Sequence, residues 1–137
     1  MNILGIDFGT KKCGLAWLQK GLDVVLPFGI IEEDSKFKPG LKPRESIKAQ
    51  LLRIIKDENI GMMVFGLPFG PDGSENDNTR RVRAFAEELK KELKVPVEFV
   101  GEEFTSQEAA GMGGDASLDE KAAMLILEAY RETLCSP

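Results

Sequence analysis

The chain has 137 residues and a formal net charge of −5, with 42% hydrophobic and 30% charged residues, which suits one globular domain over residues 1–137. It contains no histidine. That excludes Ser-His and Cys-His nucleophiles and imidazole-bound zinc, so any metal would need oxygen ligands, as Mg²⁺ and Mn²⁺ do. No apolar run approaches the roughly 20 residues that span a bilayer, and no signal pattern opens the chain, so we expect a cytoplasmic protein without a membrane partner.

The first part of the chain predicts three strands. Residues 2–8 form a mostly apolar run that ends at a glycine, which is typical of a buried strand. Residues 12–19 and 22–31 predict two further strands. Connections this short indicate an antiparallel meander.

The rest of the chain alternates helices and strands. The predicted elements are, in order, a helix after Pro43, a strand at 61–66, a helix at 78–93, a strand at 96–100, a short helical turn near 105–110 and a helix at 118–133. The order βββαβαβαα predicts an α/β fold with a mixed five-stranded sheet flanked by helices, in which the first, fourth and fifth strands are parallel. Functional sites form at the carboxyl ends of parallel strands.

Acidic residues follow two of these strand ends. Asp7 ends the first apolar strand, where a carboxylate is costly unless it is paired, hydrogen-bonded or bound to metal. An aspartate that caps its own glycine turn is an equally good explanation. Glu102 and Glu103 follow the fifth strand, and plain solvent exposure accounts for them when they are considered alone.

Asp119 lies in the first turn of the last predicted helix. Ser117 and Glu120 have the spacing of a capping box, and an acidic residue there also suits the helix dipole, so this region has a structural explanation. If Asp7, Glu102 and Asp119 converge on one pocket, the cluster indicates a cation-binding site, because clustered carboxylates repel one another unless cations neutralise them. Two metal ions held in this way can activate water and stabilise the leaving oxygen of a phosphodiester.

Basic residues after the first strand are candidates for phosphate binding. Thr10, Lys11 and Lys12 form the turn that follows Asp7. A solvated hairpin turn is at least as good an explanation for the lysines. Asp7-Phe8-Gly9-Thr10 also resembles the first phosphate loop of sugar-kinase and actin-type ATPases, which makes a nucleotide-binding module a further alternative. Those enzymes, however, enclose ATP between two such domains.

A second basic pair begins the helix at 78–93. Arg80 and Arg81 oppose the helix dipole, and with the free helix amides they would form an anion site beneath the preceding loop. Alternatively, Glu75 and Asp77 offset the positive charge of the two arginines, and no anion site is needed to explain them. The overall acidity argues against bulk attraction of nucleic acid but leaves local phosphate sites open.

Four ordered segments, at 3–9, 66–85, 102–106 and 118–130, resemble the YqgF family, also called RuvX. Its members are described as Holliday-junction resolvases and as pre-16S ribosomal RNA nucleases. The resemblance covers essentially the whole chain. It implies an RNase H-like fold, whose first three strands are antiparallel, and Mg²⁺ or Mn²⁺ as cofactor.

The resemblance also implies a function and a site. It implies a hydrolase, a metal-dependent endonuclease of structured RNA or branched DNA, with 5′-end processing of pre-16S rRNA in ribosome biogenesis as the expected role. Holliday-junction resolution, or a non-catalytic ribosome- or RNA-binding factor, is the alternative. The family's acidic triad falls on Asp7, Glu102 and Asp119, and in this assignment Asp7 bridges two metal ions.

Two departures from the family remove positive charge. Relatives usually read Asp-Glu-Arg where this chain has Gly101-Glu102-Glu103. The loop at 111–117, often basic in relatives, contains no lysine or arginine. Weaker nucleic-acid binding, an altered substrate, or dependence on ribosomal particles or a basic protein partner would each fit these changes.

Overall fold

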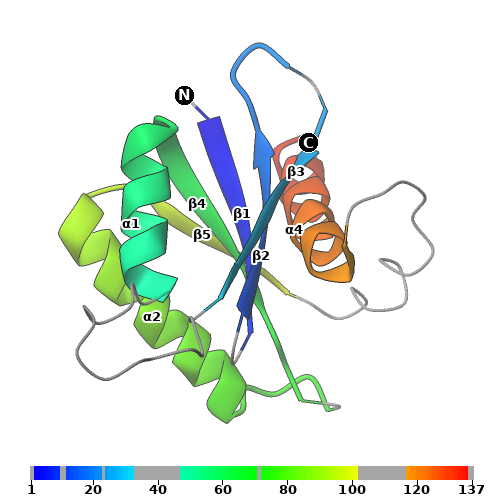
Figure 1. Ribbon diagram of the computed structural model, residues 1–137. Helices are drawn as coiled ribbons and strands as arrows, with labels where there is room; N and C mark the ends of the chain where they lie inside the picture. Colours follow the sequence, from blue (N-terminus) through cyan, green and yellow to red (C-terminus); the bar gives the residue numbers. More distant parts are fainter. Residues whose placement is uncertain are drawn as a thin grey trace, which may run out of the picture.

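The computed structural model describes residues 2–9, 12–22, 24–32, 47–70, 72–101 and 117–135. In chain order the elements are β1 (Asn2–Phe8), β2 (Lys12–Leu18), β3 (Leu26–Glu32), α1 (Ile47–Asp57), β4 (Ile60–Leu67), α2 (Asp77–Leu93), β5 (Val97–Gly101) and α4 (Leu118–Cys135). The sheet has the order β3-β2-β1-β4-β5 (Figure 1). The first three strands are antiparallel, and β1, β4 and β5 are parallel. The predicted mixed five-stranded sheet is confirmed.

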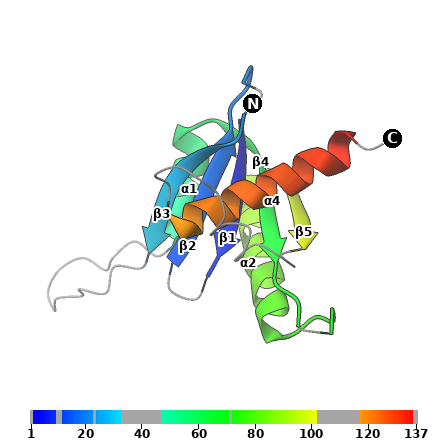
Figure 2. The same cartoon turned by 90° about the vertical axis from the view of Figure 1, so that its right-hand side faces the viewer.

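Helices cover both faces of the sheet. α1 and α2 lie on one face, and α4 crosses the other face obliquely (Figures 1 and 2). The alternation of β1 explains this division: Leu4 and Ile6 are fully buried in the core shared with α1 and α2, whereas Gly5 faces Leu127 of α4. Each fully buried leucine or isoleucine stabilises the fold by about 1.5–3 kcal/mol.

β3 begins at Leu26 rather than at Leu22, so the predicted start of this strand was wrong. Gly21 has a φ of +87°, and the N–H of Leu22 donates to the carbonyl of Gln19 at 3.0 Å, which closes a turn. Leu22 and Val24 are exposed apolar residues of the connection. Their composition is typical of a strand, but both residues are about half exposed.

The other predicted strands and the helices at 78–93 and 118–133 agree with the observed bounds within two residues. The short helical turn predicted near 105–110 lies outside the described residues. Within the described ranges, no helix combines the length and the apolar character that a membrane crossing requires.

Candidate active site

The first turn of α4 is fixed by the predicted capping box. The hydroxyl of Ser117 accepts from the N–H of Glu120 at 3.2 Å, and the carboxylate of Glu120 accepts from the N–H of Ser117 at 3.2 Å. The box therefore does not use Asp119. Instead, the Asp119 carboxylate, whose side chain is 32% exposed, lies 3.1 Å from the ammonium of Lys12.

Gly14 of β2 allows the start of α4 to approach the sheet closely. A Cβ at this position would lie 1.9 Å from the carbonyl oxygen of Asp119 and 2.9 Å from its Cβ. Gly14 is also the cross-strand partner of Asp7, and such partners have Cβ atoms about 4.5–5.5 Å apart on the same face. The Cβ atoms of Asp7 and Asp119 are therefore no more than about 8 Å apart. Two of the three predicted carboxylates come together across one glycine.

The remaining predicted residues of the acidic cluster and its turn fall outside the described ranges: Glu102, Glu103, Thr10 and Lys11. β5 ends at Gly101, beside Leu67 at the end of β4. In sequence, Glu102 therefore comes directly after the carboxyl end of a parallel strand, as predicted. In the described part of the chain, no group of three or more acidic or thiol side chains could hold a metal. The two carboxylates found there supply the oxygen donors that Mg²⁺ and Mn²⁺ prefer, and one already attracts a cationic group.

The buried thiol of Cys13 lies within electrostatic reach of this region. Its pKa is raised to about 12, chiefly by burial; a hydrogen bond with the backbone of Gly9 opposes the rise, and the charges of Asp7 and Asp119 add to it. The guanidinium of Arg81 also acts on it, in the lowering direction. The thiol is therefore uncharged at neutral pH and is not a nucleophile.

Arg81 reaches from α2 to the carboxyl end of β1. Its Nη1 donates to the carbonyl of Gly9 at 3.3 Å, and its guanidinium carbon lies 4.6 Å from the centroid of the Phe8 ring. Phe8 in turn stacks on Phe85 at 4.2 Å. The Nε of Arg81 is buried and has no hydrogen-bond partner among the described residues. Arg81 therefore braces the strand end that carries Asp7.

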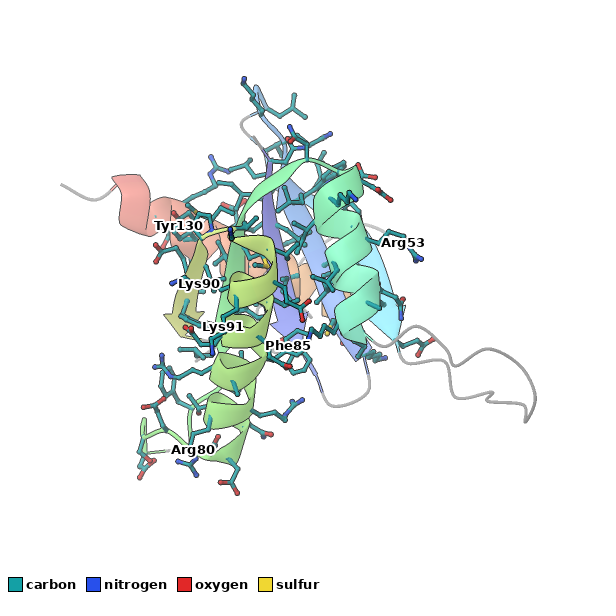
Figure 3. The ribbon with its side chains drawn as sticks, turned by 90° about the vertical axis from the view of Figure 1, so that its left-hand side faces the viewer. Arg53, Arg80, Phe85, Lys90, Lys91 and Tyr130 are labelled. Carbon is teal, nitrogen blue, oxygen red and sulfur yellow. The ribbon has the colours of Figure 1, made fainter. Side chains whose placement is uncertain are left out.

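Arg80 points elsewhere. It is exposed at the start of α2 (Figure 3) and pairs with Asp77 at 2.5 Å. Glu75 pairs with Arg83 at 2.6 Å rather than with either predicted arginine. The two adjacent arginines, predicted as one anion site, thus have separate partners, and the charge offset considered from the sequence holds for Arg80 and Asp77.

Thr79 and Gly14 were not singled out from the sequence. Thr79 is fully buried; its hydroxyl donates to the carbonyl of Pro68 and accepts from the N–H of Asn76 at 3.1 Å. Its own N–H donates to the Asn76 side chain at 3.0 Å, which completes a capping box and ties the loop after β4 to α2. The available signals were a polar residue three positions after an asparagine and a glycine inside an apolar strand.

Comparison with known proteins identifies the family. The family model described as RuvX: Holliday junction resolvase matches residues 1–133. A Maridesulfovibrio salexigens protein named "Putative pre-16S rRNA nuclease" is 33% identical, over 95% of this chain and 97% of its own length. A protein of the same name from Albidiferax ferrireducens is 35% identical, over 97% of this chain and 79% of its own.

Solved structures share the fold at low sequence identity. Thermus thermophilus RuvC in complex with a Holliday junction substrate has a TM-score of 0.62 at 15% identity, covering 98% of this chain and 97% of that one. The yeast mitochondrial Holliday junction resolvase Ydc2 has a TM-score of 0.51 at 13% identity, covering 96% and 82%. These likenesses confirm the RNase H-like fold. Together with the matched relatives, they lead to one conclusion: the chain belongs to the RuvX Holliday junction resolvase family.

Proposed function

We propose that this member of a nuclease family is a divalent-metal-dependent endonuclease whose role is 5′-end processing of pre-16S rRNA. The names of its relatives support the substrate. The observation that carries the chemistry is the approach of Asp119 to Asp7 across Gly14. Two carboxylates whose Cβ atoms lie within about 8 Å can bind a common cation, which would neutralise both charges.

Asp7, Asp119 and Glu102 would hold Mg²⁺ or Mn²⁺ as a two-metal site. Bound there, the ions would activate a water and stabilise the charge that develops on the leaving oxygen. The protein contributes rigidity, because Asp7 lies on the central strand and Asp119 on a capped helical turn. Such positioning decides rates, since a displacement of about 1 Å can cost about 100-fold.

Substrate phosphates would be contacted by the basic and hydroxyl residues around this edge. We assign that role to Thr10, Lys11, Lys12 and Arg81, and a more distant phosphate contact to Arg80, whose guanidinium pairs with Asp77 at the exposed start of α2. Lys12 supports the assignment most directly, since its side chain is 52% exposed and reaches Asp119. Because the neighbouring segment at 111–117 carries no basic residue, ribosomal particles or a basic protein would supply further contacts to the RNA.

The test is cleavage by purified protein, with Mn²⁺ or Mg²⁺, of an RNA that spans the 5′ end of pre-16S rRNA. We expect Asp7→Asn and Asp119→Asn to lower the rate by about 100-fold or more. Asp57→Asn is the matched control, because Asp57 is an exposed aspartate at the end of α1. Cleavage that survives Asp7→Asn would come from another nuclease, and the proposed site would then be wrong.

Holliday-junction resolution is the second candidate, and the description of the matching family favours it. A four-way DNA junction in the same assay separates the two. Junction cleavage with intact RNA would support resolution. Co-purification with ribosomal particles, unchanged by Asp7→Asn and without cleavage of either substrate, would instead identify a non-catalytic binding factor.

A further inference from the structure

Lys12 occupies an unusual position beside the proposed metal ligands. It is the first residue of β2, and its carbonyl accepts from the N–H of Gly9 at 3.0 Å, so the β1–β2 ladder fixes its backbone. Its side chain is half exposed, and among the described residues its ammonium pairs with Asp119 at 3.1 Å. A fixed backbone and a half-exposed side chain allow the ammonium to change partners.

A divalent ion would compete directly for the same carboxylate. An inner-sphere Mg²⁺ lies about 2.1 Å from its oxygen ligands, whereas the ammonium lies at 3.1 Å with half the charge. At equal dielectric the attraction of the metal is about three times stronger. A metal bound to Asp119 would therefore displace the lysine, and the freed ammonium would stay near the proposed metal site because the backbone of Lys12 is fixed.

We propose that Lys12 is an internal counter-ion, which neutralises Asp119 before the metal binds and is released to a substrate phosphate when the metal takes its place. The proposal rests on the proposed function, because it needs Asp119 to be a metal ligand. It assigns Lys12 two successive partners. It also predicts that the lysine weakens metal binding while strengthening nucleic-acid binding only in the metal-loaded protein.

Isothermal titration of the nucleic-acid-free protein with Mn²⁺ tests the first half. An exposed ion pair has a small free energy, so Lys12→Ala should tighten Mn²⁺ binding by about two- to fivefold. Lys12→Arg keeps the pair and should bind Mn²⁺ like the wild type. Lys20→Ala is the matched control: Lys20 is an exposed lysine beyond the other end of β2, where its N–H donates to Asn2, and it should leave the affinity unchanged.

The salt dependence of RNA binding tests the second half, with a phosphorothioate-substituted RNA to slow cleavage. In Mn²⁺, Lys12→Ala should reduce the slope of log K against log salt by about 0.7–0.9, which corresponds to one lost phosphate contact. In EDTA the two proteins should have the same slope, because Lys12 is then engaged by Asp119. Equal losses in both conditions would overturn the exchange of partners.

The possible outcomes distinguish the counter-ion role of Lys12 from the proposed metal-dependent function. If the wild type binds Mn²⁺, Asp119→Asn abolishes that binding and Lys12→Ala does not tighten it, the counter-ion role is wrong and the proposed function stands. If Lys20→Ala tightens binding as much as Lys12→Ala, the effect is general charge and the role is again wrong. If the wild type binds no Mn²⁺, the metal-dependent function fails, and the role of Lys12 fails with it.

Discussion

Replacement of Gly14 with alanine should displace one carboxylate from the other without altering either. The new Cβ would lie 1.9 Å from the carbonyl oxygen of Asp119 and 2.3 Å from its carbonyl carbon, whereas ordinary contact begins at 3.4 Å. The obstructing atoms are helix backbone, and the box formed by Ser117 and Glu120 fixes them. The first turn of α4 must therefore move from β2 by about 1.5 Å.

Two magnitudes follow from this displacement. Overpacking by one methyl group typically costs about 1–3 kcal/mol, and we expect the upper half of that range because backbone cannot rotate aside. For a chain of this length the loss corresponds to a fall in Tm of about 8–12 °C. Since a displacement of about 1 Å costs about 100-fold in rate, Gly14→Ala should lower RNA cleavage by at least that factor.

Gly5→Ala is the matched control for strain between the sheet and α4. Its Cβ would lie 2.6 Å from the side chain of Leu127 and 3.0 Å from the carbonyl oxygen of Ala123, farther along the helix from Asp119. We expect a lower Tm but no more than about a tenfold loss of cleavage. Circular dichroism gives Tm, and rates are compared where both variants are folded. Wild-type cleavage and Mn²⁺ affinity in folded Gly14→Ala would refute the reasoning.

Three further predictions concern the end of β1 and the α2 cap. Burial raises the pKa of Cys13 to about 12 from an ordinary 9.0, so the unfolded chain loses this proton first as pH rises. Stability should then fall by about 1.4 kcal/mol from pH 8 to pH 10 in urea unfolding, and Cys13→Ala should lack that loss. Arg81→Ala should lower the cleavage rate about tenfold. Arg81→Lys should not restore the rate, because an ammonium cannot reproduce the planar contact with Phe8. An equal loss of rate in Arg80→Ala would contradict a specific role of Arg81. Thr79→Val should cost about 1–3 kcal/mol in the same unfolding assay, because it removes the hydroxyl that pairs with the Pro68 carbonyl and the Asn76 N–H of the cap. Thr79→Ser should recover most of that loss.

The order of strands and helices was predictable because each element has its own local hydrophobic pattern. The apolar run of β1 and the helical periodicity of α2 and α4 depend on residues close in sequence. The start of β3 was not predictable in the same way. Leu22 and Val24 have strand-like composition, and only the turn at Gly21 shows that they belong to the connection.

Part of the candidate site was likewise predictable from the sequence, and part of it was not. Asp7 and Asp119 were identified separately, and strand order suggested that they meet. The close contact at Gly14 was not predictable, because it depends on how deeply α4 packs against β2. Arg80 and Arg81 were grouped because they are neighbours in sequence, but successive helical residues point about 100° apart, which sends one to Asp77 and the other to the end of β1.

The division of the carboxylates between β1 and α4 has a consequence during protein synthesis. Asp7 lies on β1, which is synthesised before α4, the helix that carries Asp119. A nascent chain that lacks residues beyond 116 can pair β1 with β2 but leaves Gly14 uncovered. Asp7 and Asp119 therefore cannot approach each other before α4 has been synthesised and has packed against β2. Docking of α4 is therefore the folding step that would assemble the proposed metal site.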